Sequence, residues 1–240
     1  MQQYIVEEFI ETGKEIELSQ EQAHHIQDVL RMKEGSIIRL VFPLEKQAAF
    51  GKISMHGKKV VAYIDEMDNE RHELPCRITL CIGLIRKEKW EYILQKATEL
   101  GVDTIVPFIS QRTVVKSKEE KWTNKKDRWN KIVLEAMEQS KRESLPRIED
   151  VCKFKDLSKY QSELNCVGYE NIAQTGKSLR SLVQSQMSIS VVIGPEGGFA
   201  EEEIQYLTEL GYHCISLGKR ILRAETAACH VLSVISGLVE

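Results

Sequence analysis

A glycine-rich segment near the C-terminal end of the chain has the residue types of a small-molecule binding loop. The apolar run Ile189–Ile193 leads into Gly194-Pro-Glu-Gly-Gly198, and Glu201–Glu203 open the helix predicted next. Ligands bind at strand ends in open α/β sheets, and glycines let them approach the backbone. The segment is neither GxGxxG nor a P-loop, and its acidic residues would repel phosphate. A ligand with positive or no net charge, such as a sulfonium cofactor, therefore fits better. A tight turn followed by acidic residues that suit the helix dipole is the alternative.

Arg223 and Glu225 form a second candidate pair, because they stand where a strand, a glycine turn and an apolar final helix meet. Their segment reads LGKRILRAETA and covers residues 217–227. Charges at the mouth of a buried helix are costly unless they are paired or used. The pair could therefore serve chemistry, and a salt bridge at the helix start is the alternative.

Basic residues gather in the middle of a chain whose net charge is −3. Residues 1–72 contain 9 Lys/Arg and 13 Asp/Glu, whereas residues 85–147 contain 15 and 10, including KEEKWTNKKDRWNK. Such a stripe can bind phosphates in a protein of acidic total charge, although a solvated helix face is the alternative. Lys96 with Glu99, and Glu138 and Gln139 with Arg142, share helix faces in pairings that are usually ordinary surface pairs.

The first seventy residues are predicted to form short strands around one helix. The strand-like runs are Gln2–Ile10, Ser36–Val41 and Lys59–Ile64, and Ser19 with Gln22 resembles a capping box that opens a helix. Many short strands with one helix favour a small β-barrel. The acidic stretch Asp65–Glu73, which ends at Pro75, is the predicted linker.

After Pro75 the pattern changes to alternating strands and helices. Strand-like runs recur at 77–85, 103–109, 164–169, 189–194 and 213–217, with helical spacing of apolar residues between them. This alternation is typical of a largely parallel sheet covered by helices. The last predicted helix, Ala224–Val239, is apolar nearly all round, so we expect it to be buried in a core or against another subunit.

Composition excludes several other classes of protein. A hydrophobic fraction of 42% and a charged fraction of 29% are those of an ordinary soluble globular protein. No apolar run is long enough to span a membrane, and the N-terminus does not have the pattern of a signal peptide, which predicts a cytoplasmic protein. The six cysteines form no CxxC pair and the histidines are scattered, so buried free thiols and no metal site are expected.

Four segments together resemble one family. VVIGPEGGF, LGKRILRAETA, QKATELGV and the RW…EQ…R stretch are similar to enzymes that methylate N3 of a uridine in small-subunit (16S) ribosomal RNA, the RsmE-like branch of the SPOUT superfamily. A match of four segments in the right order is highly specific. HHIQDVLRMKEG resembles the family's N-terminal PUA-like barrel, so the likeness runs from end to end. Such proteins commonly carry an arginine near the start, where this chain has Gln3.

The resemblance implies a two-domain α/β fold: a PUA-like β-barrel at 1–72 that docks RNA, and a SPOUT methyltransferase domain at 73–240 with a mostly parallel sheet. It also implies a C-terminal trefoil knot, against the general rule that chains are unknotted, and a homodimer. The implied cofactor is S-adenosyl-L-methionine, in a bent form on backbone groups, with no metal and no membrane. The implied cofactor-binding residues are Tyr169, Ile193, Gly194, Glu196, Gly197, Gly198, Leu217, Gly218, Ile221, Leu222 and Arg223.

The partner implied by the resemblance is ribosomal RNA, within the small ribosomal subunit. The expected RNA contacts are Arg31, Lys96, Arg112, Lys125, Lys126, Arg128 and Arg142. Methylation of a uridine nitrogen requires that its proton be lost or its anion stabilised. Arg223 is the candidate for stabilising charge on the uracil oxygens, and Glu225 for orienting that arginine or taking the proton. A non-enzymatic RNA-binding protein and a nucleotide-phosphate enzyme are the alternatives, and the acidic residues at 201–203 count against the latter.

Overall fold

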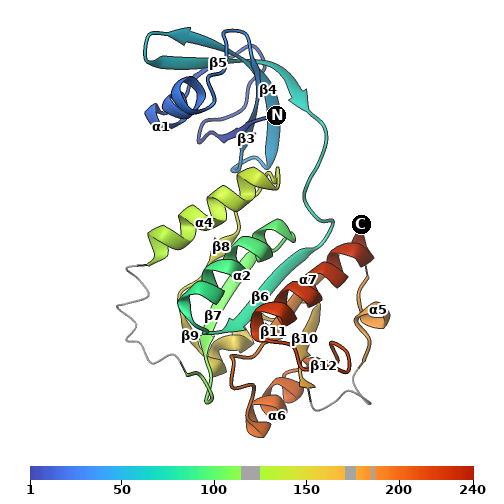
Figure 1. Cartoon of the computed structure of the whole chain (residues 1–240). Coiled ribbons are helices and arrows are strands. Elements are labelled where there is room, and N and C mark those ends of the chain that lie inside the picture. The colour runs from blue at the N-terminus through green and yellow to red at the C-terminus, as the bar shows by residue number, and fades with distance from the viewer. Residues whose placement is uncertain (115–124, 171–176, 185–186) are drawn as a thin grey trace. The chain divides into compact units, whose positions relative to one another are not determined.

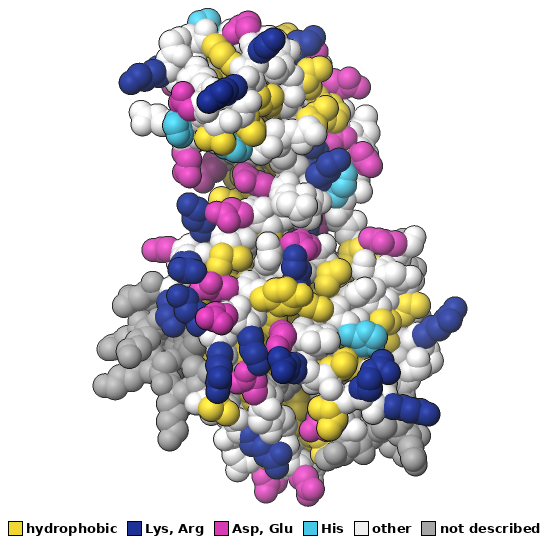
Figure 2. Space-filling model, in the orientation of Figure 1, with side chains coloured by type: hydrophobic (Ala, Val, Ile, Leu, Met, Phe, Trp, Pro, Cys, Tyr) yellow, Lys and Arg dark blue, Asp and Glu magenta, His cyan; other side chains and the backbone are white. Residues whose placement is uncertain are grey.

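The computed structural model describes residues 1–114, 125–170, 177–184 and 187–240, and the chain divides into two compact units (Figure 1). The first unit contains Met1–Glu73 and Met137–Leu145, and the second contains Leu74–Ala136 and Pro146–Glu240. On the face shown in Figure 2, basic and acidic side chains are interspersed over the surface of each unit. None of the helices within the described ranges is long and apolar enough to cross a membrane.

The first unit is built on a five-stranded mixed sheet. Its strands run in the order β1-β3-β4-β5-β2, with β1 parallel to β3 and every other neighbouring pair antiparallel. Alternating side chains from these strands form one core cluster that includes Ile38, Leu40 and Ile64. The strands are β1 (Gln3–Ile5), β2 (Glu15–Glu17), β3 (Ile37–Phe42), β4 (Gln47–His56) and β5 (Lys59–Asp68).

The capping box predicted at Ser19 is present. The Ser19 hydroxyl accepts a hydrogen bond from the Gln22 backbone N–H, and the Gln22 side chain accepts one from the Ser19 N–H. Together they start α1 (Gln20–His24), which continues as the π-helical turn η1 (His25–Val29). The helix buries Ala23 and Ile26 against the sheet core.

A buried arginine on β3 joins the sheet to the chain that follows helix α4. The Arg39 Nε donates to Asp68 at 2.6 Å, its Nη2 pairs with Glu143, and its Nη1 donates to Gln3 Oε1 at 2.5 Å and to the Lys141 carbonyl at 2.8 Å. Gln3 is therefore an internal hydrogen-bonding residue of this unit. These bonds are the reason why residues 137–145 belong with the N-terminal strands.

The predicted linker at 65–73 is wrong in part. Strand β5 extends to Asp68, and Glu73 accepts hydrogen bonds from the backbone N–H groups of Glu143 and Ser144. Glu73 also pairs with Arg142 at 2.7 Å. The acidic residues of this stretch are thus used to hold a distant segment, which charge composition alone does not reveal.

The second unit contains a fully parallel sheet in the order β12-β10-β11-β6-β7-β8, with β9 also paired to β7. This arrangement confirms the parallel sheet expected from the alternation of elements. The strands are β6 (Arg77–Gly83), β7 (Thr104–Ile109), β8 (Arg147–Ile148), β9 (Cys152–Lys153), β10 (Leu164–Gly168), β11 (Ser188–Ile193) and β12 (His213–Ile215). The helices are α2 (Lys87–Glu99), α4 (Lys126–Gln139), the 3-10 helix η2 (Phe154–Tyr160), α5 (Leu179–Leu182), α6 (Glu201–Glu209) and α7 (Ala224–Val239).

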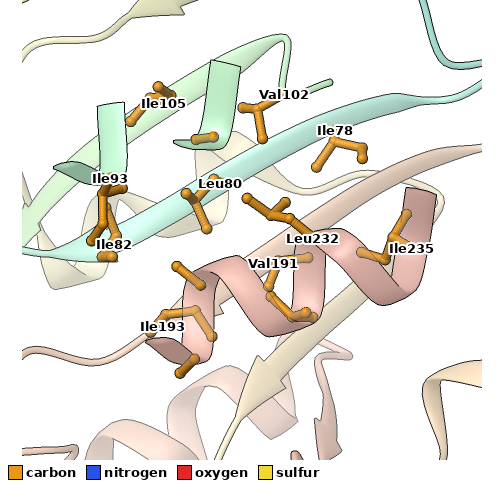
Figure 3. Close-up of a cluster of buried hydrophobic side chains, with 14 of the residues drawn as sticks. Ile78, Leu80, Ile82, Ile93, Val102, Ile105, Val191, Ile193, Leu232 and Ile235 are labelled. Atoms are coloured by element: carbon orange, nitrogen blue, oxygen red, sulfur yellow. The ribbon is translucent and has the colours of Figure 1, made fainter. Parts of the chain in front are cut away.

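Helices cover both faces of this sheet because its strands are apolar on both sides. Ile78, Leu80 and Ile82 of β6 face the cluster that α2 and α7 complete, as Figure 3 shows. The intervening Cys81, with Val192 of β11, faces a second cluster formed with η2 and α6. Such two-sided burial is expected for strands of parallel sheets.

The apolar side of helix α7 is buried against other elements of the same chain. Its apolar stripe, which includes Val231, Leu232 and Ile235, packs on the sheet and on α2 (Figure 3). Its exposed positions are mostly small or polar: Thr226, His230, Ser233 and Gly237. The expected burial of this helix in a core is therefore confirmed, although its exposed positions show that it is not apolar nearly all round.

Candidate functional site

Three neighbouring strands of the second unit end at one edge of the sheet. Gly168 at the end of β10 pairs with Ile193 of β11 on one side and with Ile215 of β12 on the other. Because the strands are parallel, the loops that follow them meet at this edge, which is where ligands bind in open α/β sheets. These loops are Tyr169–Glu170, Gly194–Ala200 and Ser216–Arg223.

The three loops line a cavity of about 440 Å³. This volume lies within the range of small-molecule sites in proteins. All eleven residues predicted to bind a cofactor line it: Tyr169, Ile193, Gly194, Glu196, Gly197, Gly198, Leu217, Gly218, Ile221, Leu222 and Arg223. The structure therefore brings together segments that are up to 54 positions apart in the sequence, from 169 to 223.

Two glycines of the cavity wall cannot be replaced without strain. Gly198 has a φ of +68°, and a Cβ there would lie 3.1 Å from Glu170 Oε1. A Cβ on Gly197 would lie 2.7 Å from the backbone carbonyl oxygen of Arg112. Glycine at these positions lets the loop turn sharply and keeps the cavity open.

Lys89 of α2 supplies a positive charge that the sequence did not predict. Its Nζ lies 2.6 Å from Glu196 Oε1 in the glycine loop and 3.5 Å from Glu225 Oε1 in the first turn of α7. The hydrogen bond to Glu196 raises the pKa of Lys89 above its usual value, so the ammonium stays charged.

The two predicted catalytic residues occupy different positions. Arg223 is the N-cap residue of α7, is exposed, and lines the cavity beside Ala224 and Ala227. Glu225 is not among the lining residues; it reaches the cavity through its ion pair with Lys89. Among the described residues, its Oε2 atom is buried and has no hydrogen-bond partner.

The charges around the cavity are unevenly placed. Two carboxylates, Glu170 and Glu196, lie on the loops after β10 and β11, and three basic residues, Lys219, Arg220 and Arg223, lie on the loop after β12. Carboxylates suit a ligand with positive groups, and exposed basic side chains suit a polyanion at the mouth. Within the described ranges, no cluster of three or more His, Cys, Asp or Glu side chains could hold a metal ion.

Known proteins match this chain over both units. The RNA methyltransferase domain family matches residues 72–236, and the RNA methyltransferase PUA domain family matches residues 18–62. Ribosomal RNA small subunit methyltransferase E of Bacillus subtilis is 38% identical over 246 residues, covering 98% of this chain and 96% of the relative. The chain belongs to the ribosomal RNA small subunit methyltransferase E family.

Three further proteins extend the comparison. The Synechocystis enzyme is 34% identical, covering 94% of this chain and 74% of its own. The crystal structure of the Neisseria gonorrhoeae enzyme bound to S-adenosyl methionine has a TM-score of 0.89 and 28% identity, covering 99% of this chain and 98% of that one. A Legionella pneumophila structure in complex with the cofactor SAM has a TM-score of 0.85 and 30% identity, covering 98% and 96%.

The RNA contacts expected for this methyltransferase are scattered, and several are already ion-paired. Lys126 pairs with Asp150 at 2.7 Å, Arg128 with Glu91 at 2.8 Å, and Lys96 with Glu99 at 2.9 Å. Figure 2 likewise shows basic side chains with acidic ones between them on the face that carries α2. These exposed pairs leave the basic groups near the surface, where phosphates could compete for them.

The remaining predicted contacts differ in their exposure. Arg31 is exposed in the first unit with a φ of 51°, Arg112 is exposed with its carbonyl next to Gly197, and Lys125 is partly buried. Arg142 is only 1% exposed and pairs with Glu73, so its guanidinium does not reach the surface and the predicted RNA contact is corrected. Residues 118–124 of the basic stripe lie outside the described residues.

Sequence reasoning missed nine residues that line the cavity of this methyltransferase. Most lie inside the segments 191–199 and 217–227 or next to Tyr169, so including each segment whole and both neighbours of Tyr169 would have covered them. Lys89 is different, because it precedes the nearest predicted cavity residue by 80 positions and no spacing links the two. The missed residues are Lys89, Gly168, Glu170, Pro195, Phe199, Lys219, Arg220, Ala224 and Ala227.

Proposed function

We propose that this methyltransferase transfers the methyl group of S-adenosylmethionine to N3 of a uridine in 16S ribosomal RNA. The single observation that carries the proposal is the cavity at the ends of β10, β11 and β12, which gathers all eleven residues predicted to bind the cofactor. The cofactor complexes of the Neisseria and Legionella proteins support the same ligand. Because the substrate is ribosomal RNA, the enzyme acts in the cytoplasm.

The residues of the cavity suit S-adenosylmethionine chemically. Glycine backbone in the 194–198 loop can lie close to the adenosine, and the carboxylates of Glu170 and Glu196 can meet ammonium or hydroxyl donors. The cofactor supplies an electrophilic methyl group on a sulfonium. The cavity residues would hold it in a bent form, with Leu217 and Leu222 providing apolar contacts.

The chemical task of the protein is to position the uridine and to stabilise its anion. N3 of a neutral uridine carries a proton, and its loss places negative charge on the uracil oxygens. Arg223 is exposed at the mouth of the cavity, where its guanidinium can donate hydrogen bonds to those oxygens. Glu225, the second predicted catalytic residue, lies behind Lys89 rather than in the cavity wall.

The finer architecture of the family belongs to the same proposal. The C-terminal chain, which includes the loop after β12 and helix α7, would pass through a loop and so form the trefoil knot. Residues 1–72 would form a barrel that docks RNA for the catalytic domain at 73–240. The proposed homodimer rests on the resemblance, since α7 is already buried within its own chain. Sedimentation at micromolar protein should give the mass of two chains, and a purely monomeric species would contradict the dimer.

Mass spectrometry of nucleosides tests the proposed reaction directly. Small-subunit RNA, free and in assembled subunits, is incubated with the protein and labelled S-adenosylmethionine, then digested. The expected product is labelled 3-methyluridine. Label in another nucleoside would overturn the assigned atom, and no label with either substrate would overturn the proposed reaction.

A further inference from the structure

Lys89 joins three elements that surround the cavity. It stands in the first turn of α2, and its ammonium is bonded to the glycine loop after β11 through Glu196 and to α7 through Glu225. Glu196 lines the cavity, as does Lys89 itself, whereas Glu225 does not. The order of contacts from the helix to the ligand site is therefore Glu225, Lys89, Glu196.

Glu225 depends on Lys89 for its counter-charge. Its side chain is only 14% exposed, and its single ion pair among the described residues is the one with Lys89. A buried carboxylate without a cation is costly, so these two residues are expected to act as a unit. Burial raises the pKa of the Cys229 thiol, one turn further along α7, and the charge of Glu225 adds a smaller contribution in the same direction.

Glu196 has one carboxylate oxygen fixed by Lys89 at 2.6 Å, and no described residue forms a hydrogen bond with the other. Its side chain is 23% exposed at the cavity wall. A carboxylate held in place by a cation keeps its remaining lone pairs in a defined direction. The Glu196 carboxylate can then accept hydrogen bonds from a bound ligand without first being ordered. Because less conformational entropy is lost on binding, the affinity is higher.

We propose that Lys89 and Glu225 are positioning residues for the cofactor: Glu225 anchors Lys89 to α7, and Lys89 holds the Glu196 carboxylate toward the donor groups of S-adenosylmethionine. This inference rests on the proposed function. It assigns Glu225 to cofactor binding through Lys89 instead of to proton transfer. The pair then affects the affinity for the cofactor, and Arg223 the rate of methyl transfer.

The test measures cofactor affinity and chemistry separately in the full-length protein. Calorimetry gives the Kd for S-adenosylmethionine, and single-turnover methylation of small-subunit RNA at saturating cofactor gives the rate constant. The variants are Lys89→Met, Lys89→Arg, Glu225→Gln and the double variant Lys89→Met/Glu225→Gln. Lys87→Met is the matched control, because Lys87 lies on the same turn of α2, is 55% exposed and does not line the cavity.

Lys89→Met is expected to raise the Kd about ten-fold or more, since it removes a charge-assisted hydrogen bond that orders Glu196. The rate at saturating cofactor should stay within about three-fold of the wild type, because the lost contact acts equally before and during transfer. Lys89→Arg should recover most of the affinity. Glu225→Gln should raise the Kd as well, and adding it to Lys89→Met should cause little further loss, as expected for residues that act as one unit.

Several outcomes would overturn the inference. An unchanged Kd in Lys89→Met would show that Glu196 needs no positioning, and additive losses in the double variant would separate Glu225 from Lys89. A lower rate constant in Glu225→Gln with an unchanged Kd would instead assign Glu225 a role in methyl transfer. If Lys89→Met does not fold, Lys89→Gln replaces it. The Kd is measured without RNA. A wild-type protein that binds the cofactor but makes no 3-methyluridine would therefore refute the proposed reaction, while the Kd values of the variants would still test the positioning role.

Discussion

Gly198 lies in the glycine loop beside the carboxylate of Glu170. Its φ of +68° is strained for any residue with a Cβ, and the added atom would lie 3.1 Å from Glu170 Oε1. We expect Gly198→Ala to weaken S-adenosylmethionine binding at least about ten-fold, because the loop would shift into the space of the ligand. Calorimetry provides the measurement.

Gly211 is the matched control for this substitution. It has a φ of +88°, nothing lies within 4 Å of the position of its Cβ, and it does not line the cavity. Gly211→Ala should cost about 1 kcal/mol of stability from backbone strain alone and leave cofactor affinity unchanged. Equal affinity losses in both variants would mean that strain, not the site, causes the effect at Gly198.

Arg223 is the cavity residue whose charge suits the anion of the substrate. We expect Arg223→Ala to lower the single-turnover rate about 100-fold and to change the Kd for S-adenosylmethionine far less, because the guanidinium meets charge that develops in the transition state. The exposed Arg180 of α5, which does not line the cavity, is the control for loss of a positive charge. Parallel losses of rate and affinity in Arg223→Ala would instead assign Arg223 to cofactor binding.

At the scale of elements, the sequence predicted best what periodicity and caps determine locally. The final helix was predicted at 224–239 and is found there, and the capping box at Ser19 is present. Strand β4 was missed, because Gly51 and its bulge interrupt the alternation along Gln47–His56. The predicted strand at Gln2–Ile10 shortens to Gln3–Ile5, because only these residues pair with β3.

The parts that could not be predicted depend on contacts between residues far apart in the chain. Lys89 and Glu196 are 107 positions apart, and their pairing depends on how β6 and β11 lie side by side. Arg39 and Glu143 are 104 positions apart. The spacing of residues along the sequence indicates neither ion pair. The cavity loops could be recognised, because each has a distinctive local composition.

The Arg39 cluster is the element-scale feature with the largest expected effect on stability. Arg39→Met would leave Asp68 and Glu143 buried without their cation, and we expect a loss of about 3–5 kcal/mol in the free energy of unfolding of the first unit. Denaturant unfolding measures it. Lys52→Met is the control, because Lys52 pairs with Asp65 at 2.7 Å on the surface of the same sheet, where solvent screens the pair, and should change the free energy of unfolding far less.

The same cluster gives this unit a defined response to acid. Burial favours the neutral form of Asp68, but the hydrogen bonds from Arg39 and from the Glu70 backbone, together with the nearby positive charge of Arg39, outweigh this and lower the pKa of Asp68 below its usual value. A carboxyl with a lowered pKa stabilises the fold above the unfolded value, about 3.9, and loses that contribution as the pH falls through the lower folded value. A stability difference between wild type and Arg39→Met that does not shrink below pH 4 would contradict this role for Asp68.

At the scale of the whole molecule, the chain places its predicted cofactor segments after Pro75 and its PUA-like sequence before it. A cut at residue 74 does not separate the units cleanly, since Met137–Leu145 belongs with the N-terminal strands. Met137 packs with Val41 and Ala48, and Glu143 pairs with Arg39. A protein that starts at Leu74 therefore exposes Met137, and Met137→Gln should be included to keep it soluble.

We expect that shortened protein to bind S-adenosylmethionine nearly as well as the full chain, because all the cavity residues are retained. It should methylate RNA poorly, since phosphate contacts bring RNA near without choosing a base. Basic residues such as Lys126 and Arg128 remain, so part of the salt-sensitive RNA affinity should persist, with a smaller slope against salt concentration. Cofactor Kd and single-turnover methylation are measured for both proteins across a salt series, with full-length Met137→Gln as the control. If the shortened protein folds and methylates its uridine at the full rate, residues 1–72 do not dock the substrate; if it folds but binds no cofactor, the methyltransferase unit depends on them for its own site.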